Sequence, residues 1–221
     1  MESYSESGPE LFTHSQIFSD LMQIRSSDSI SVLEGRLQDF RKLKKASAEK
    51  LFSELCFCIL TANTSAEMGL RMQEGIGIDG FLGLSSDQLC RRLKELKYRF
   101  YNVRSRFIVE ARSILDDLPE LVNSPDPLKS REFLISEVPG ISYKESSHFL
   151  RNVGVFSLAI LDKHILRIMN SIDPSTDMKV TPPRRYLEKE QTFMEYSKVV
   201  NMEPGELDLY LWFMATGKVI K

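Results

Sequence analysis

Apolar residues recur at helical spacing along almost the whole chain, and the strict alternation typical of half-buried strands is absent. The clearest case is the segment 46–62, in which apolar residues cover most faces of the expected helix. Such a helix must be surrounded by other elements, so we expect it at the centre of the fold. With 221 residues, 42% of them hydrophobic, the chain can bury a substantial core. The pattern predicts an all-α protein.

Further helices are expected wherever this spacing returns. They are predicted for residues 16–24, 31–43, 65–74, 87–95, 102–115, 128–138, 143–153 and 184–200, for a segment that opens at Asp162, and for a last segment after Gly205. Ser65 should cap the helix at 65–74, and Gly75, Gly77 and Gly80 should break it. Asp126 and Pro127 suit the start of the helix that follows them.

No internal repeat or low-complexity linker divides the chain into independent domains. We therefore expect two helical lobes around a cleft. Residues 1–47 should pack with the C-terminal lobe, residues 48–145 should form the lobe that ends in a hairpin, and residues 146–221 should form the C-terminal lobe.

The composition argues against several classes of protein. No apolar run approaches the roughly 20 residues that cross a bilayer, and the polar, acidic N-terminus is unlike a signal peptide. We therefore expect a cytoplasmic protein without a membrane partner. Cys56, Cys58 and Cys90 lack the spacing of a zinc site or a disulfide framework, and the histidines show no ligand spacing. No metal and no cofactor are expected.

Basic residues are concentrated in one segment, although the net charge is only −2. Between residues 91 and 112 they outnumber the acids Glu95 and Glu110, and aromatic residues such as Phe100 lie among them. This segment, with Arg99 and Arg104, could follow a DNA backbone. It could equally be a solvated helix face held by apolar anchors.

A Pro-Gly turn joins two of the expected helices in the stretch Val138-Pro139-Gly140-Ile141-Ser142. Most such turns merely reverse the chain. At the start of a helix, however, their backbone N–H groups can also hold one DNA phosphate, and we expect residues 139–142 to do so. A left-handed backbone at Ser142 would cost on the order of 1 kcal/mol more than at a glycine.

Lys144 follows this turn directly, and Asp162 stands 18 residues later in Leu161-Asp162-Lys163-His164. A nucleophile and a carboxylate are the groups needed to attack the sugar of a bound nucleotide. The amine must be neutral, so we expect burial in an apolar cleft to lower its pKa from about 10.4. The carboxylate can stabilise the positive charge left on the sugar, although Asp162 also suits the N-cap of its helix. His164 should orient the side chain of Asp162 or pack beside it.

These residues together resemble the helix-hairpin-helix DNA glycosylases. In that superfamily a lysine at this place marks the bifunctional members, which cut the N-glycosidic bond and then cleave the DNA strand. The chain differs in one respect, because that superfamily usually has a second glycine where Ser142 stands. Residues 209–221 resemble the C-terminus of the second class of 8-oxoguanine DNA glycosylases, found mainly in archaea and some bacteria, and residues 60–66 and 98–104 agree. The resemblance extends from about residue 30 to the end.

The resemblance implies a two-lobed, all-α enzyme that removes oxidised guanine from duplex DNA after flipping the base into the cleft. We also expect a monomer that is associated with the nucleoid. Lys144 and Asp162 fall on the family's catalytic pair. Trp212 matches the aromatic residue that stacks on the base, and Lys221 the residue whose α-carboxylate hydrogen-bonds to it. By analogy, Asn63 enters the gap left by the base.

Each of these assignments has an alternative. Phe100 is a second candidate for stacking, but Trp212 could belong to the core, Lys221 could be a frayed end, and Asn63 could be a helix cap. For the whole chain, three other functions remain open. They are a glycosylase for another oxidised base such as a pyrimidine, a non-catalytic helix-hairpin-helix DNA-binding module, and a helical scaffold for protein contacts.

Overall fold

The computed structural model describes residues 14–26 and 29–221, and all regular secondary structure within these ranges is helical. The helices, in chain order, are α1 (His14–Arg25), α2 (Ser29–Leu43), α3 (Ala48–Thr61), α4 (Ala66–Gly83), α5 (Ser86–Glu95), α6 (Tyr101–Ala111), η1 (Arg112–Ile114), α7 (Leu118–Asn123), α8 (Pro127–Glu137), α9 (Tyr143–Asn152), α10 (Lys163–Ile172), α11 (Pro183–Val199) and α12 (Pro204–Thr216). The all-α prediction is confirmed. The polar N-terminal residues 1–7 lie outside the described ranges.

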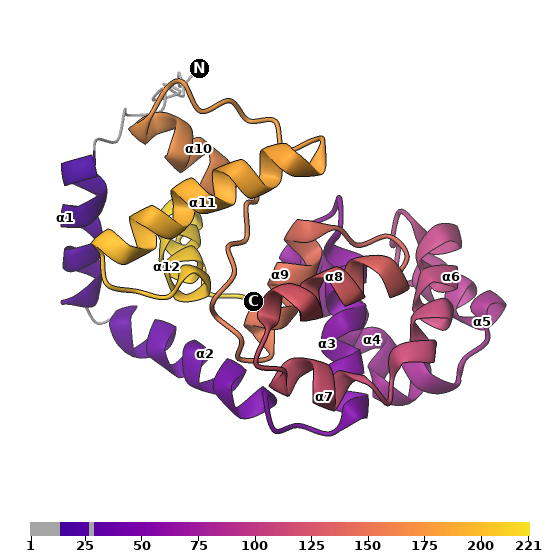
Figure 1. Ribbon diagram of the computed structural model, residues 1–221. Coiled ribbons are helices and arrows are strands. Elements are labelled where there is room, and N and C mark those ends of the chain that lie inside the picture. Colours follow the sequence, from indigo (N-terminus) through magenta and orange to yellow (C-terminus); the bar gives the residue numbers. More distant parts are fainter. Residues whose placement is uncertain (1–13, 27–28) are drawn as a thin grey trace, which may run out of the picture.

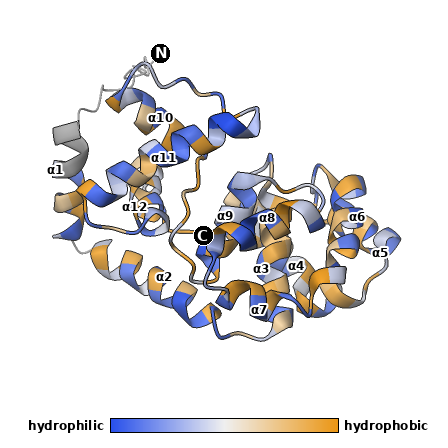
Figure 2. Cartoon of the chain, viewed as in Figure 1, coloured by the Kyte–Doolittle hydropathy of each residue, from blue (hydrophilic) through white to orange (hydrophobic). Residues whose placement is uncertain are grey.

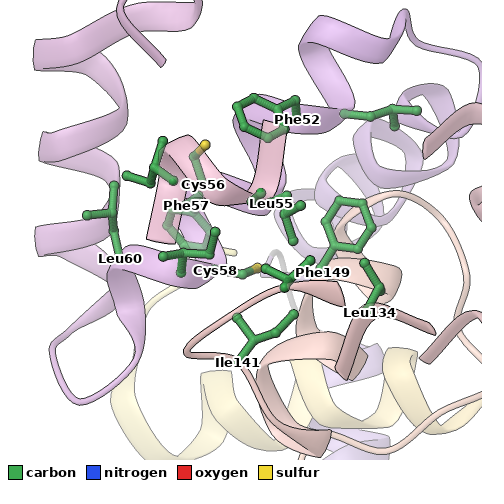
Figure 3. Packing of buried hydrophobic residues seen from close by; sticks show 14 of the residues in the cluster. Phe52, Leu55, Cys56, Phe57, Cys58, Leu60, Leu134, Ile141 and Phe149 are labelled. Atoms are coloured by element: carbon green, nitrogen blue, oxygen red, sulfur yellow. The ribbon is translucent and has the colours of Figure 1, made fainter. Parts of the chain in front are cut away.

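The helices form two groups, and each group has its own apolar core (Figure 1). The first lobe contains α3 to α9 around the central helix α3, whose residues from Leu51 to Leu60 are all buried. Figure 2 shows α3 mostly in the hydrophobic colour, inside its lobe. In Figure 3, α3 side chains face Leu134 of α8, Ile141 of the turn and Phe149 of α9. The prediction of a central buried helix at 46–62 is confirmed.

The second lobe joins the two ends of the chain. Its core takes Leu21 from α1 and Leu33, Leu37 and Phe40 from α2, and combines them with residues of α10, α11 and α12. The helices α1 and α2 thus share a core with the C-terminal helices. The structure does not follow the expected division at residue 145, since Phe149 and Leu150 of α9 belong to the first core. The chain changes lobe after α9, because the second helix of the hairpin packs against α3.

Two helices differ from the predictions. α4 extends to Gly83 and is broken at only one of the three glycines expected to break it, Gly77, where φ is 72° and ψ is 169°. Gly75 and Gly80 remain helical, and a Cβ at either position would lie less than 3 Å from Leu96 or Ile76, so these two glycines allow close packing. The short helix α7 was not predicted, since its six residues are too few to show a helical repeat of apolar positions.

Two buried ion pairs connect the lobes. Arg131 of α8 donates through Nη2 to Oε2 of Glu190 on α11 at 2.9 Å, and both side chains are almost fully buried. Arg151 of α9 faces Asp208 of α12, with 3.4 Å between Nη1 and Oδ2. No helix among the described residues is long and apolar enough to cross a membrane.

Candidate active site

A cavity of about 340 Å³ opens between the two lobes. Its walls come from the end of α3 and the start of α4, from α9 and α12, and from the segment that leads into α10. The residues to which the family resemblance assigned catalysis or base recognition line it, namely Lys144, Asp162, Trp212 and Lys221. The fold thus brings together residues separated by up to 77 positions in the chain.

Lys144 stands in the first turn of α9 and points into the cavity. Its Nζ lies 2.9 Å from Oε1 of Glu145, and the lysine side chain is 32% exposed. The apolar burial expected from the sequence is therefore absent in the unliganded cleft. Burial raises the pKa of Glu145, but the charge of Lys144 and hydrogen bonds from Lys144 and Ser142 outweigh it, so this pKa lies below its ordinary value.

Asp162 is the N-cap of α10, as its position in the sequence indicated. Its Oδ1 accepts hydrogen bonds from the backbone N–H groups of His164 at 2.8 Å and Ile165 at 2.9 Å. Oδ2 has no hydrogen-bond partner among the described residues. One carboxylate can thus cap the helix with one oxygen and keep the other for a ligand in the cavity.

Trp212 of α12 is half-buried, and its ring lies edge-on to that of His164, with 6.5 Å between the centroids. His164 therefore packs beside the tryptophan and contacts Asp162 only through its backbone. Neighbouring Asp208 also lines the cavity. Burial raises the pKa of Asp208 to about 7; the charge of Arg151 opposes this shift and that of Asp162 adds to it.

The chain ends inside this site. After α12 the tail runs between the lobes, and Figure 1 shows the C-terminus beside α9. Burial lowers the pKa of His148 well below its usual range, whereas a hydrogen bond to the backbone of Lys221 acts in the opposite direction. The terminal residue lines the same cavity as His148 and Lys144 of α9.

The hairpin turn lies on the surface at the start of α9. Gly140 has φ 82°, a conformation that favours glycine, whereas Ser142 has φ −135° and is extended. The strain considered for a serine at 142 is therefore absent. The N–H and hydroxyl of Ser142 both donate to Oε2 of Glu145, at 3.2 and 2.7 Å. The carboxylate of Glu145 therefore takes the N–H of Ser142, one of the backbone groups expected to hold a phosphate.

Other residues singled out from the sequence lie outside the cavity lining. Phe100 packs on the first core, and the guanidinium of Arg99 lies 4.5 Å from its ring centroid. Arg104 is buried and donates to the carbonyls of Gly140 at 2.9 Å and Ala62 at 3.3 Å. It supports the hairpin turn from within and is not exposed along the surface. Asn63 is exposed, with φ 62°, at the end of α3.

Much of the basic segment is nevertheless exposed. Arg91, Arg92, Lys94, Lys97, Arg99 and Arg106 all have exposed side chains. Arg112 is used internally, because it donates to the carbonyls of Phe81 and Leu84. The first lobe therefore presents exposed cations on α5, in the loop after it and on α6, which favours contact with a polyanion.

The sequence reasoning missed several residues of the site. Glu145 could have been found, because Ser142 and Glu145 have the spacing of a capping box. Glu54 and Gln73, which contact Lys221, gave no local signal, since one looks like part of a buried helix and the other like an exposed polar residue.

Residues 33–202 match the family model described as 8-oxoguanine DNA glycosylase. The chain belongs to this family. Among its relatives, the 8-oxoguanine DNA glycosylase/AP lyase of Thermoplasma acidophilum is 56% identical over 191 residues, which are 86% of this chain and 92% of the relative.

Solved structures agree with this assignment. The crystal structure of the 8-oxoguanine DNA glycosylase of Thermotoga maritima matches with a TM-score of 0.88 at 41% identity, covering 94% of this chain and all of that one. The Methanocaldococcus jannaschii 8-oxoguanine glycosylase/lyase, crystallised with a 15mer DNA containing 8-oxoguanine, matches with a TM-score of 0.88 at 41% identity. That match covers 93% of this chain and 99% of the other.

Proposed function

We propose that this protein removes 8-oxoguanine from duplex DNA and then cleaves the strand, with Lys144 as nucleophile and Asp162 as the stabilising carboxylate. One observation carries the proposal: a single cavity between the lobes is lined by an amine, a carboxylate, an aromatic ring and the chain terminus. A non-catalytic DNA-binding module would have no need of this combination. The names of the related glycosylase/lyases support the same activity.

The reaction begins when the lone pair of Lys144 Nζ attacks C1′ of the deoxyribose. The bond from C1′ to N9 of the base breaks, and its electron pair leaves with the base. The free oxygen of Asp162 faces the positive charge that develops on the sugar. Trp212 offers a surface on which the extruded base stacks, and the α-carboxylate of Lys221 accepts the N7–H that distinguishes 8-oxoguanine from guanine.

Strand cleavage follows from the covalent intermediate. Sugar ring opening gives an imine between Nζ and C1′, whose nitrogen makes the C2′ hydrogen acidic. When a base removes this proton, the C3′–O3′ bond breaks and the 3′ phosphate leaves by β-elimination. Before the attack, Lys144 must lose its proton and separate from Glu145. DNA binding would favour this separation. A phosphate of the strand competes with the Glu145 carboxylate for the backbone N–H of Ser142 at the start of α9, and displacing that carboxylate frees Lys144.

DNA contact is proposed at the hairpin residues 139–142, with Asn63 entering the stack and exposed cations such as Arg99 along the backbone. Because every residue of the site comes from one chain, we also propose that the enzyme works as a monomer. Because its substrate is DNA, we propose that the enzyme is associated with the nucleoid.

The substrate is tested with three duplexes that are identical except for one position, which carries 8-oxoguanine, guanine or an oxidised pyrimidine. The proposal predicts base release and strand cleavage with the first, and little reaction with the other two. If the oxidised pyrimidine were released faster, that base would become the proposed substrate in place of 8-oxoguanine. No release from any duplex would contradict the glycosylase activity.

A further inference from the structure

The side chain of the terminal residue Lys221 reaches into the first lobe, although the tail belongs to the second. Its Nζ donates to Oε1 of Glu54 on α3 and to Oε1 of Gln73 on α4, both at 2.7 Å. The same ammonium lies 5.0 Å from the ring centroid of Phe57. The lysine side chain is 14% exposed and that of Glu54 is 7% exposed, so this contact is largely shielded from solvent.

The orientation of Gln73 is fixed by its other partners. Its amide Nε2 donates to the carbonyl and the hydroxyl of Ser53, both at 3.0 Å, and to Oε1 of Glu54 at 3.1 Å. Because the NH₂ group of Gln73 is occupied by these hydrogen bonds, its amide oxygen is the atom that accepts from Lys221. The ammonium therefore meets a carboxylate, an amide oxygen and an aromatic face, all of which attract a cation.

The tail depends on such contacts for its position. α12 ends at Thr216, and residues 217–221 have no regular secondary structure that would fix the terminus. A second ion pair, from Lys218 to Glu67 at the start of α4, spans the cleft at 2.7 Å, but its side chains are 59% and 48% exposed. Exposed pairs hold a chain weakly because water competes for them. The contact of Lys221 with Glu54 and Gln73 is the shielded one of the two.

We infer that Glu54 and Gln73 form a socket for the ammonium of Lys221, and that this socket holds the α-carboxylate of the same residue at the base-binding cavity. Both are positioning residues, since they touch the tail and do not line the cavity. The inference rests on the proposed function in one respect, the contact between the terminal carboxylate and the oxidised base. It explains why a lysine side chain, and not only a free carboxylate, stands at this end of the chain.

The test uses three variants of the full-length protein, Glu54→Gln, Gln73→Leu and Lys221→Met. Each keeps the terminal carboxylate and weakens the socket. Two single-turnover reactions are measured for each variant, release of 8-oxoguanine from a duplex and cleavage of a duplex that already contains an abasic site. We expect base release to fall by about tenfold or more while abasic cleavage stays within about twofold, because an abasic site has no base to position. General damage to the fold would lower both reactions together.

Glu67→Gln serves as the comparison within the same tail, because it weakens the exposed pair, and Glu67 itself also lines the cavity. Its effect on base release should be much smaller than that of Glu54→Gln. The double variant Glu54→Gln with Lys221→Met should be no slower than the slower single variant if both act through one contact. Equal effects of Glu54→Gln and Glu67→Gln, or additive effects in the double variant, would overturn the socket.

The outcomes also separate this inference from the proposed function. If the wild-type protein releases no 8-oxoguanine, the proposed function fails. If it does release the base and loses this ability when residues are appended after Lys221, the tail is needed. Unchanged base release by Glu54→Gln and Gln73→Leu in that case would refute the socket alone. Should Glu54→Gln fail to fold in a thermal melt, the half-buried Gln73 and the chain-terminal Lys221 still supply the test.

Discussion

At the scale of single residues, the two oxygens of Asp162 have different surroundings, and this separates its structural role from its chemical one. Oδ1 accepts both capping hydrogen bonds, and an asparagine amide oxygen would accept them as well. We expect Asp162→Asn to slow release of 8-oxoguanine by about 10²-fold or more, because the negative charge near C1′ is lost. The melting temperature should change little. If stability and activity fell in proportion, Asp162 would be only a cap.

Asp208 predicts a pH dependence of stability. Its pKa is raised to about 7, mainly by burial, so between about pH 4 and pH 7 the folded protein keeps a proton that the unfolded chain has lost. The contribution of this group to the free energy of unfolding is therefore present at low pH and lost as pH rises through the folded pKa. Asp208→Asn should not show this loss. Urea melts at several pH values check this, and parallel curves for the two proteins would contradict it.

Single residues also show where sequence reasoning succeeds. Lys144, Asp162, Trp212 and Lys221 could be selected because each belongs to a local pattern, and the fold places them around one cavity. The side chain of Lys221 seemed dispensable from the sequence, since only its α-carboxylate had a role. Its partners Glu54 and Gln73 lie 167 and 148 residues away, and no local pattern reports so distant a contact.

At the scale of elements, the hairpin turn depends on Gly140 for two reasons. Its φ of 82° is unfavourable for other residues, and a Cβ there would lie 2.3 Å from the ring of Phe107 and 2.4 Å from Nη1 of Arg104. Gly140→Ala should therefore lower the free energy of unfolding by at least about 2 kcal/mol and weaken DNA binding. Gly35→Ala is the control, because Gly35 lies within α2 with nothing within 4 Å of an added Cβ.

The control should be neutral or stabilise the protein by up to about 1 kcal/mol, since alanine favours helix more than glycine does. Equal stability of the two variants in denaturant melts would contradict the role given to Gly140.

Elements were predicted best where capping residues mark their ends. The start of α8 at Pro127 follows the cap Asp126, whose side chain accepts a hydrogen bond from the N–H of Lys129. Glycine was the less reliable signal, because of the three glycines expected to break α4 only Gly77 does so, while Gly75 and Gly80 stay helical and allow close packing against Leu96 and Ile76. Whether a glycine breaks a helix depends on neighbours that come from other parts of the chain.

At the scale of the whole molecule, the arrangement of the lobes depends on buried charges between them. Glu190 accepts from Arg131 and from the backbone N–H of Ala159, and the carboxylate is 2% exposed. Glu190→Gln leaves a buried guanidinium without its counter-charge, which costs about 3–5 kcal/mol. Glu188→Gln, on the exposed face of the same helix, should cost little, and calorimetry compares them. Similar melting temperatures would show that the pair does not hold the lobes together.

Two lobes were expected because no linker divides the chain, whereas residues 146–152 of α9 were expected in the C-terminal lobe and pack in the first one. The sequence of a helical hairpin does not by itself indicate which lobe its second helix packs against. The burial of Phe149 and Leu150 against α3 decides it, and it keeps Lys144 fixed to the first lobe while Asp162 and Trp212 belong to the second. The cavity therefore depends on how the two lobes meet.

The central claim is that Lys144 forms a covalent bond with the sugar, and borohydride trapping tests it most directly. The wild-type protein is incubated with a duplex bearing one 8-oxoguanine, borohydride is added, and covalent protein–DNA adducts are measured. We expect an adduct with the wild-type protein and none with Lys144→Gln, which should still bind the damaged duplex within about tenfold, because it keeps the hairpin. An undiminished adduct with Lys144→Gln would contradict the account.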